Sequence, residues 1–429
     1  MNYRETLAFL FNSLPVYQRV GKAAYKEGLG NTLALDSYFS HPHTRYDTIH
    51  IAGTNGKGSV SHMMASVLAT AGFRTGLYTS PHLVDFRERI RVNGVMIPEN
   101  EVVQFVARHR GIIESVSPSF FEMTVAMAFD HFARMGVDVA VIETGMGGRL
   151  DSTNIITPVL SVITNIGHDH MEFLGDTLQK VAGEKAGIIK PGVPVVIGET
   201  NPETVGVFEN AASRNASPIS FADRNYSCRL SGYRSGMSSR GFIITRNDGG
   251  HTITGKTPLP GDYQSRNLVT LFQSLASVAG RYNLTEKQIT DGVALTVSST
   301  GLSGRWQVLG REPLVICDTA HNREGLEWVL RQLRRLKYHR LHIVLGFVSD
   351  KDLASVLPLF PEEAVYYFTR ASVPRALDPE ILRSEAGRYG LTGKAFPDVR
   401  SAMLAAGHSA LPDDVIFVGG STFVVAEAV

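Results

Sequence analysis

Short apolar runs alternate with longer stretches of helical spacing along most of this chain. The apolar runs have the length of buried strands. They span residues 48–52, 75–79, 137–142, 159–164 and 194–198. Between them, apolar residues recur every three or four positions and predict helices, among them helices beginning near residue 57 and covering 99–115 and 121–135. Strands that alternate with helices favour a mostly parallel sheet with right-handed crossovers.

The pattern changes between residues 219 and 257. Two short strand-like runs, 242–245 and 251–254, flank Asn247-Asp-Gly-Gly250, which is a typical hairpin turn. We therefore expect a small antiparallel subsheet here, followed by helices over 267–282 and 285–293.

Residues 298–304 are small, polar and contain two glycines, which is typical of a linker. Beyond them a new alternation of strands and helices begins, and it contains no G-x-G-x-x-G fingerprint. The predicted fold class is α/β. We expect a P-loop-containing, mostly parallel sheet domain with a small antiparallel subsheet over 1–297, a linker over 298–304, and a C-terminal Rossmann-like α/β domain over 305–429.

A glycine-rich turn, Gly53-Thr-Asn55-Gly56-Lys57-Gly58-Ser59, joins the first strand to its helix. Glycines let backbone N–H groups converge on phosphate oxygens, and the helix N-terminus adds its positive dipole end. Lys57 is expected to bridge the β- and γ-phosphates, with the Ser59 hydroxyl beside the phosphates and Mg²⁺. The spacing differs from the common P-loop pattern because Ile51 replaces its first glycine and Gly58 separates lysine from serine. An ordinary turn rich in small residues is the alternative.

Further polar residues follow the ends of the predicted parallel strands. Ser80 follows the second strand, Glu143 ends the strand over 137–142, and His170 follows the strand over 159–164. Ligands of open α/β sheets bind at this edge. The same edge carries the phosphate loop, so these residues are expected to lie near a bound nucleotide.

The composition narrows the class of protein. The 429 residues carry 42 basic and 41 acidic side chains, a net charge of +1, which makes nucleic acid an unlikely main partner. Only Cys228 and Cys317 occur, without a metal-type spacing, which suits a reducing compartment. No apolar run reaches membrane-spanning length and no signal pattern is visible. We expect a cytoplasmic monomer without a membrane or nucleic-acid partner.

Six segments occur in a characteristic order: Gly53–Ser59, Tyr78-Thr-Ser-Pro81, Glu143-Thr-Gly-Met-Gly-Gly-Arg-Leu-Asp151, Asp169-His170, Glu184-Lys-Ala-Gly-Ile-Ile189 and Asp318-Thr-Ala-His-Asn322. In these segments the chain resembles the folylpolyglutamate synthase/dihydrofolate synthase branch of the Mur ligase superfamily over essentially its whole length. The resemblance implies ATP-dependent joining of L-glutamate to dihydropteroate or a reduced folate through an acyl phosphate, with release of ADP and phosphate.

The resemblance also implies a metal site with two Mg²⁺ ions, and ATP as co-substrate. It assigns Ser80 and Glu143 to the Mg²⁺ on the phosphates, and Glu143 with His170 to a second ion. It further implies that Lys185 is carbamylated by CO₂ and becomes an anionic ligand of that ion. From the residues alone, Glu143 could be a surface carboxylate at a strand end, His170 a structural histidine and Lys185 a helix-surface lysine.

Nucleotide contacts outside the loop are implied for Asn267, Arg305 and Asp318, with the nucleotide clamped between domains. His321 is implied to orient the reacting phosphate or amine. A solvated surface arginine is the alternative for Arg305.

Substrate contacts are implied for Ser119, Leu150, Asp151 and Ser152, which match positions that contact dihydropteroate. Phe120 and Phe121 could stack on the pterin ring, although adjacent phenylalanines are more often part of a core. Lys351 and Arg375 are candidates for holding glutamate, and each could instead be a solvated charge.

Two other functions compete. A peptidoglycan Mur ligase would carry a UDP-recognising domain ahead of the phosphate loop, and only about fifty residues precede it here. A nucleotide-dependent switch would need a guanine-reading Asn-Lys-x-Asp segment, and the chain has no Asn-Lys pair.

Overall fold

The computed structural model describes residues 1–15, 28–169 and 171–429. Two compact units divide the chain. The first consists of Met1–Arg229, Phe242–Lys256 and Ser265–Gly301. The second consists of Leu230–Gly241, Thr257–Gln264 and Leu302–Val429, so it is assembled from three separate stretches of sequence.

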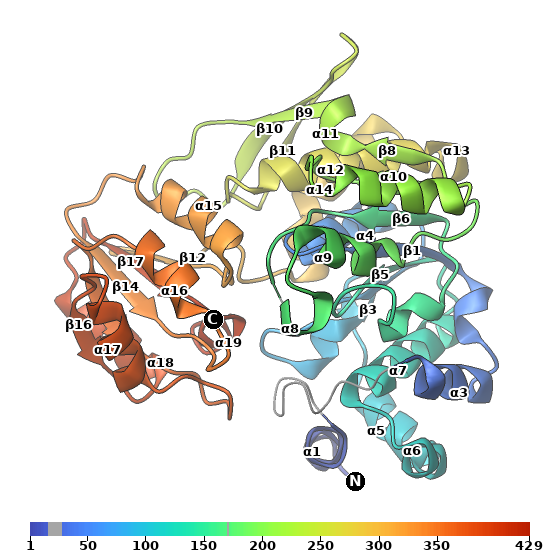
Figure 1. Cartoon of the computed structure of the whole chain (residues 1–429), viewed down its shortest axis with the longest axis horizontal. Helices are drawn as coiled ribbons and strands as arrows, with labels where there is room; N and C mark the ends of the chain where they lie inside the picture. The colour runs from blue at the N-terminus through green and yellow to red at the C-terminus, as the bar shows by residue number, and fades with distance from the viewer. Residues whose placement is uncertain (16–27, 170) are drawn as a thin grey trace. The chain divides into compact units, whose positions relative to one another are not determined.

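The first unit contains an eight-stranded sheet in the order β4-β3-β2-β5-β1-β6-β7-β8 (Figure 1). The strands are β1 (Asp47–Ala52), β2 (Thr75–Tyr78), β3 (Ile90–Val92), β4 (Val95–Met96), β5 (Val139–Glu143), β6 (Leu160–Ile163), β7 (Val195–Ile197) and β8 (Ile219–Phe221). From β2 to β8 all neighbours are parallel, whereas β3 pairs antiparallel with both β2 and β4. The predicted mostly parallel sheet is confirmed.

The β3–β4 hairpin was not predicted, because residues 85–91 are polar and have the composition of a loop. In the structure they form η3 (Phe86–Arg89) and the start of β3. Arg91 is only 7% exposed, and its Nη1 donates to Gly94 O at 3.1 Å. In the sequence, this buried arginine of the hairpin cannot be distinguished from a solvated charge in a loop.

Helices of the first unit surround this sheet. They are α1 (Tyr3–Ser13), α3 (Gly30–Tyr38), α4 (Lys57–Thr70), α5 (Glu99–Arg108), α6 (Arg110–Val116), α7 (Phe120–Arg134), α8 (Met171–Leu174), α9 (Leu178–Ala186), α10 (Val205–Arg214), α11 (Ala222–Asn225), α12 (Gln264–Ser277), α13 (Ala279–Tyr282) and α14 (Glu286–Thr300), with the 3₁₀ turns η2 (Pro42–Arg45) and η4 (Ser152–Ile155). The single helix expected over 99–115 is wrong, because His109 leaves helical geometry (φ −107°, ψ 15°) and separates α5 from α6.

Helix α4 follows the phosphate loop and is buried nearly all round. Ten of its residues, from Ser59 to Leu68, are buried. A helix that is buried on every face belongs in the interior of a domain. It packs against α14 and against strands β1, β2 and β5, so the start of α4 is held by the core of the first unit.

A three-stranded antiparallel sheet, in the order β11-β10-β9, follows in the sequence. Its strands are β9 (Tyr226–Leu230), β10 (Arg240–Arg246) and β11 (Thr252–Thr257). The turn between β10 and β11 contains Asn247 to Gly250, as the hairpin signal predicted.

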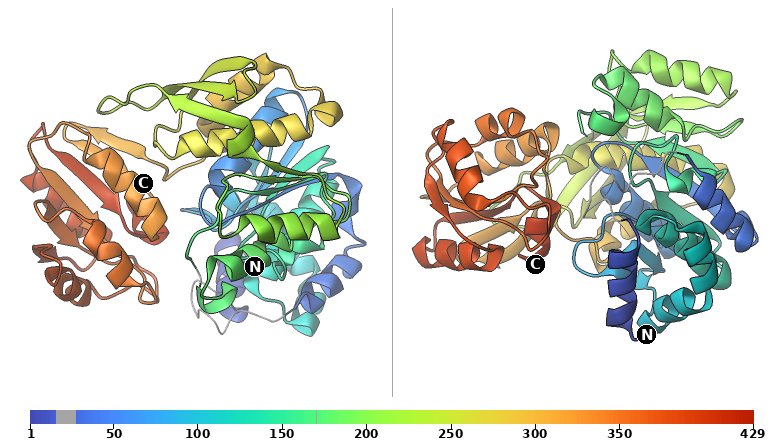
Figure 2. Two further views of the ribbon diagram at one scale, coloured as in Figure 1. Left: turned by 45° about the horizontal axis from the view of Figure 1, so that its top comes forward. Right: turned by 60° about the horizontal axis from the view of Figure 1, so that its bottom comes forward.

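The second unit has a six-stranded sheet in the order β12-β13-β17-β14-β15-β16, with helices on both sides (Figure 2). Its elements are β12 (Gln307–Arg311), β13 (Leu314–Cys317), α15 (Arg323–Leu333), β14 (Leu341–Leu345), α16 (Leu353–Val356), η5 (Leu357–Leu359), β15 (Val365–Phe368), α17 (Pro379–Gly387), β16 (Gly393–Ala395), α18 (Val399–Ser409), β17 (Val415–Gly419) and α19 (Thr422–Ala426). Only the edge strand β12 is antiparallel to its neighbour. Trp306, Phe368 and Phe417 are fully buried in its core.

Helix α14 runs further than the sequence indicated. It ends at Thr300, and Gly301 caps it in the left-handed region with φ 66°. Residues 298–300, which looked like the start of a linker, are therefore helical. The end of this helix lies against the β3–β4 turn, where a Cβ on Gly94 would stand 1.6 Å from Ser299 O.

Candidate nucleotide and ligase site

The phosphate loop leaves β1 at Ala52 and enters α4 at Lys57. Two of its glycines are required by their surroundings. Gly53 has φ +147°, and a Cβ there would stand 1.9 Å from Thr164 Oγ1. Gly56 has φ +87°, and a Cβ there would stand 2.3 Å from Asn267 Oδ1. The absence of side chains thus brings Asn267 of α12 directly against the loop.

The end of β6 holds the loop backbone in place. Asn55 N donates to Asn165 Oδ1 at 2.8 Å, and Thr164 Oγ1 donates to Asn55 O at 2.6 Å. Thr54 Oγ1 accepts from Gly167 N at 3.0 Å. With the Asn55 N–H already bonded, the N–H groups of the first turn of α4 are the ones directed along the helix axis toward a ligand.

Lys57 lies over its own loop. Its Nζ donates to Gly53 O at 3.0 Å and to Thr54 O at 3.2 Å. The ammonium group is therefore held at the mouth of the loop, where a positive charge favours a bound anion.

Lys185 shares the same acceptor. Its Nζ donates to Gly53 O at 2.8 Å, and the side chain is only 4% exposed, so the interpretation as a surface lysine is wrong. Burial, and then the neighbouring charge of Lys57, lowers the pKa of Lys185 to about 7, although Asp169 and Asp151 act in the opposite direction. Residue 185 is thus a buried amine that is easily deprotonated.

Glu143 and Ser80 lie together at the next strand ends. Glu143 is 4% exposed and pairs with Ile51 across β5 and β1. Ser80 N donates to Glu143 Oε2 at 3.2 Å. The surface-carboxylate interpretation of Glu143 is therefore wrong. His170 lies outside the described residues. Within the described ranges, no three His, Cys, Asp or Glu side chains form a group that could hold a metal ion.

The glycine loop after Glu143 packs on the end of α9. A Cβ on Gly148 would stand 2.9 Å from both Glu184 O and Lys185 O. Arg149 N donates to Glu184 O at 2.8 Å, and Arg149 Nη2 lies 2.9 Å from Glu184 Oε1. These contacts bring two of the six motif segments together and explain why Lys185 is buried.

The Asp151 carboxylate accepts hydrogen bonds from residues on both sides of it in that loop. Its Oδ2 accepts from Met146 N at 2.9 Å, and its Oδ1 accepts from Thr153 N at 3.0 Å and Thr153 Oγ1 at 2.5 Å. Burial raises the pKa of this carboxyl group, and the hydrogen bonds partly offset that effect. Ser152 opens η4 and is 9% exposed, while Leu150 is half-buried. The carboxylate thus fixes the turn that presents Leu150 and Ser152.

Ser119 begins α7. Its Oγ accepts from Glu122 N at 3.2 Å, and Ser119 N donates to Glu122 Oε2 at 2.6 Å, which is a capping box. Phe120 stacks on Phe11, with ring centroids 4.8 Å apart, and belongs to the core. Phe121 is half-buried and lies over Gly145, where a Cβ would stand 2.5 Å from its ring. Of the two rings, only that of Phe121 borders the glycine loop.

Three predicted residues of the second unit also cluster. Asp318 accepts from Trp306 N at 2.7 Å, from Tyr263 Oη at 2.6 Å and from Ala320 N at 2.8 Å. Burial raises its pKa. Arg305 donates to Thr319 Oγ1. His321 Nδ1 donates to Thr319 O at 2.9 Å, which leaves the lone pair of a neutral ring on Nε2.

The two glutamate candidates occupy adjacent loops of the second unit. Ser349 N donates to Arg375 O at 2.8 Å, and Val348 forms an isolated bridge with Ala376. Arg375 Nη2 pairs with Asp350, next to Lys351 in sequence. The arginine interpreted as a possible solvated charge is thus 15% exposed and held in an ion pair.

Comparison with known proteins shows the family to which this chain belongs. Residues 51–274 match the Mur ligase middle domain, and residues 304–422 match the Mur ligase glutamate ligase domain. The folylpolyglutamate synthase of Lacticaseibacillus casei is 33% identical over 439 residues, covering 99% of this chain and 97% of that protein. The chain belongs to the folylpolyglutamate synthase/dihydrofolate synthase family. It is a ligase of this type, and the predicted family is confirmed.

A second relative of this ligase is longer. The probable bifunctional folylpolyglutamate synthase/dihydropteroate synthase of Haloferax volcanii is 35% identical over 441 residues, which cover 100% of this chain and 50% of that protein. The ligase therefore spans half the length of that relative.

Solved structures share the fold of the ligase. Escherichia coli FolC in complex with DHPP and ADP is 28% identical, with a TM-score of 0.85 over 100% of this chain and 97% of that one. A bifunctional folylpolyglutamate synthase/dihydrofolate synthase with Mn, AMPPNP and L-glutamate bound is 26% identical, with a TM-score of 0.84 and the same coverage. The α/β prediction with mostly parallel sheets is confirmed as a FolC-like fold.

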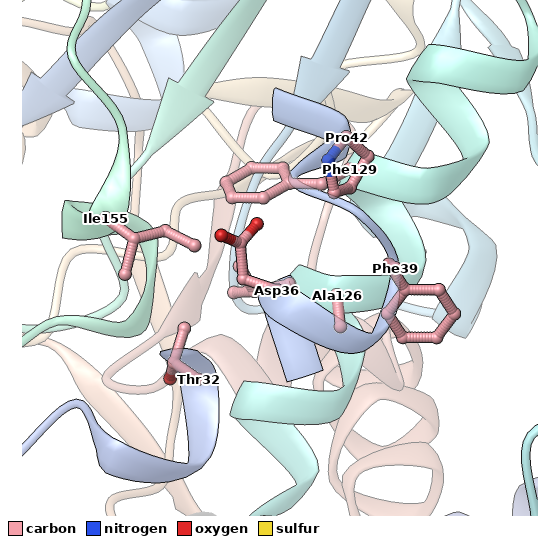
Figure 3. A pocket seen from close by; sticks show the side chains of 8 residues that line it. Thr32, Asp36, Phe39, Pro42, Ala126, Phe129 and Ile155 are labelled. Atoms are coloured by element: carbon pink, nitrogen blue, oxygen red, sulfur yellow. The ribbon is translucent and has the colours of Figure 1, made fainter. Parts of the chain in front are cut away.

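The ligase also has a small cavity away from the phosphate loop (Figure 3). It measures about 10 Å³, room for one water molecule. It is lined by Thr32, Asp36, Phe39, Pro42, Val125, Ala126, Phe129 and Ile155. Asp36 accepts from His41 Nδ1 at 2.6 Å and from His43 Nδ1 at 2.8 Å. The cavity is far too small for a pterin ring.

Sequence reasoning left Asn165 and Tyr263 of the ligase without a role. The position of Asn165 directly after β6 was a usable signal, because polar residues at strand ends border the ligand edge of the sheet. Tyr263 gave no local signal, since its partner Asp318 lies 55 positions later. Across the described part of the chain, no helix is both long and apolar enough to span a membrane.

Proposed function

We propose that this ligase joins L-glutamate to dihydropteroate, reduced folates or both, at the expense of ATP, and releases ADP and phosphate. The observation that carries the proposal is the convergence of Lys57 and Lys185 on one carbonyl of the phosphate loop, with Glu143 and Ser80 at the adjoining strand ends. This arrangement supports phosphoryl transfer to a carboxylate, because the Lys57 ammonium group and an anion-binding helix start lie where negative charge must be brought together.

The proposed reaction has two steps. A carboxylate oxygen of the acceptor attacks the γ-phosphorus of ATP, the bond to the β–γ bridging oxygen breaks, and ADP leaves. The amine of glutamate then attacks the carbonyl carbon of the acyl phosphate, the C–O bond to phosphate breaks, and one proton is released. Lys57 offsets the phosphate charge in the first step, and Asn55, Gly56, Gly58, Ser59 and Asn267 position the nucleotide.

The donor set near the loop fits Mg²⁺. The Glu143 carboxylate and the Ser80 hydroxyl are hard oxygen donors, and Mg²⁺ is usually held by one or two carboxylates together with substrate phosphates. When bound, the ion would neutralise phosphate charge. A second ion would be held by Glu143, His170 and a modified Lys185. The relative with Mn, AMPPNP and L-glutamate bound supports a divalent metal in this family.

The environment of Lys185 supports carbamylation. With a pKa of about 7, about half of these amines are neutral at pH 7, against about one in 2,500 at the reference value of about 10.4. The neutral amine attacks CO₂ at carbon and the adduct loses one proton, so the neutral side chain becomes an anionic carbamate. The carbamate keeps one N–H, for which Gly53 O is a ready acceptor.

The remaining site residues complete the proposal. Arg305 and Asp318 contact the nucleotide, and His321 orients the phosphate or the amine through Nε2. Ser119, Leu150, Asp151 and Ser152 border the pterin substrate, with Asp151 and Ser119 acting mainly by holding their turns. Lys351 and Arg375 hold glutamate.

A product assay tests the proposal. The chain is incubated with Mg²⁺, ATP and glutamate together with dihydropteroate, tetrahydrofolate or a UDP-muramoyl acceptor. ADP, phosphate and a glutamylated pterin or folate are expected only with the first two acceptors. AMP with pyrophosphate, or turnover only with the UDP-muramoyl acceptor, would contradict it.

A further inference from the structure

Glu199 follows β7, which pairs with β6 on the side opposite β1 and its phosphate loop. The preceding residue, Gly198, has no room for a side chain, because a Cβ on it would stand 2.2 Å from Thr164 O and 2.5 Å from Thr270 Oγ1. The end of β7 is therefore in contact with both the end of β6 and helix α12. All of these residues belong to the first unit.

Three side chains connect the loop backbone to α12. Because Asn55 N is a donor, the oxygen of the Asn165 amide faces it, at 2.8 Å, and the amide nitrogen is turned away. Asn165 Nδ2 then donates to Glu199 Oε1 at 3.5 Å, the longest contact of the series. Glu199 Oε2 accepts from Arg266 Nη1 of α12. We call Asn165, Glu199 and Arg266 the loop relay.

The relay ends beside a second contact with the same loop. Asn267 follows Arg266, and its Oδ1 lies where a side chain of Gly56 would be. The phosphate loop is thus contacted at two places: the relay reaches Asn55, and Asn267 lies against Gly56. Both contacts depend on the position of the first turn of α12. The ion pair between Glu199 and Arg266 links that turn to the end of β7.

The charge of Arg266 favours the ionised form of Glu199. Burial raises the pKa of Glu199 and Asp223 adds to the effect, while Arg266 and the Asn165 hydrogen bond oppose it. A partly buried carboxylate without its cation would take up a proton or turn to solvent. Either change would release Asn165 and α12 together.

We propose that Glu199 is a positioning residue for nucleotide binding, which through the loop relay holds the phosphate loop and α12 in one geometry. The inference rests on the proposed role of the loop in binding ATP. Glu199 is assigned no contact with ATP, so its effect is expected on ATP affinity and not on the acceptor.

Equilibrium binding of MgATP alone tests the proposal. Glu199→Ala and Arg266→Ala are each expected to weaken ATP binding about tenfold, the size of a coupling within one hydrogen-bonded network. The double variant should be no weaker than either single variant, because the two residues act as one unit. KM for dihydropteroate should stay within about twofold. Glu203→Ala is the matched control, since Glu203 is exposed, lies in the same segment, and its carboxylate accepts from Gln179 Nε2 at 3.5 Å.

Hydrogen exchange of the Asn55 amide separates this inference from the proposed function. Its protection should fall in Glu199→Ala and persist in Glu203→Ala, whether or not ATP is present. A folded Glu199→Ala protein with wild-type ATP affinity overturns the inference, as does additive loss in the double variant. A lower unfolding temperature with unchanged ATP affinity would mean a structural role only and also overturns it. If the unaltered chain does not bind MgATP, the proposed function fails, and Asn55 exchange alone then decides whether the relay exists.

Discussion

Lys57 and Lys185, 128 positions apart in sequence, donate to the same oxygen atom, Gly53 O, at 3.0 and 2.8 Å. Two ammonium groups on one carbonyl repel each other, and the buried one is the easier to deprotonate. The two lysines on this carbonyl therefore differ in environment: Lys57 is half-buried over its own loop, whereas Lys185 is buried and more easily deprotonated.

Replacement of Lys57 by alanine is expected to lower kcat/KM for ATP by about 100-fold or more, because one charge-stabilising donor is commonly worth that much. The unfolding midpoint should change little, since the Lys57 ammonium group donates to two carbonyls of its own loop. Lys180→Ala is the control, because Lys180 is exposed and pairs with Asp176. Near-normal turnover by a folded Lys57→Ala protein would contradict the assignment of the phosphate loop.

Activity should depend on CO₂ through Lys185. Removing CO₂ and bicarbonate is expected to lower turnover, and adding bicarbonate should restore it. Lys185→Ala should be inactive and partly rescued by a small carboxylate such as acetate, whereas acetate should not rescue Lys57→Ala. Intact mass showing an unmodified lysine in a fully active, metal-loaded enzyme would refute carbamylation.

The buried amine also gives the fold a pH dependence. Lys185 has a lowered pKa of about 7 in the folded state and about 10.4 when unfolded, so between these values the unfolded chain binds the extra proton. Stability should therefore rise with pH in this window, by up to about 1.4 kcal/mol per pH unit, and be independent of this group below pH 7. Urea unfolding in CO₂-free buffer between pH 7 and 9 should show this slope in the wild type and lack it in Lys185→Met. Equal slopes would show that the group titrates normally.

Two glycines with similar backbone angles should respond differently to alanine. Gly72 has φ +99° and nothing within 4 Å of an added Cβ, so Gly72→Ala should cost only about 1 kcal/mol of backbone strain. Gly56 has φ +87°, and the added Cβ would meet Asn267 Oδ1 at 2.3 Å. Gly56→Ala should therefore weaken ATP binding about tenfold or more in addition to the strain. Calorimetric titration with ATP distinguishes the two, and equal affinities would contradict the role of Asn267.

The adjacent phenylalanines of α7 should separate stability from substrate binding. Phe120→Ala removes a core ring and is expected to cost about 3–5 kcal/mol. Phe121→Ala should be less destabilising and should raise KM for dihydropteroate about threefold to tenfold, the worth of a ring contact. Unfolding curves and steady-state kinetics measure both. An unchanged KM in Phe121→Ala would remove that ring from the pterin site.

The sequence predicted best what local patterns control. The strand, glycine turn and helix around Lys57 were recognisable because each has its own spacing, and the strand ends at Ser80 and Glu143 followed from the parallel sheet. The burial of Lys185 was not recognisable, because it depends on Gly148 and Arg149 packing on the end of α9. The pattern of apolar residues in α9 itself gives no sign of that contact.

Other features depended on partners distant in sequence. Asp318 was recognised as a strand-end carboxylate, but its bonds to Tyr263 and Trp306 come from segments that fold beside it. The hairpin of β3 and β4 was missed because buried Arg91 resembles a solvated charge. The break at His109 was missed because apolar residues continue at helical spacing on both sides of it.

The second unit is assembled from three stretches of chain, and this fixes an order of events during synthesis. Arg240 pairs with Asp262 at 2.6 Å, both emerge from the ribosome early, and Asp262 N donates to Gln332 Oε1 at 2.6 Å. Tyr263 is likewise synthesised before its hydrogen-bond partner Asp318. The early stretches therefore lack these partners until the last third of the chain is made. A fragment that begins at Leu302 would lack these partners, so the glutamate ligase domain of this protein cannot be separated by one cut in the sequence.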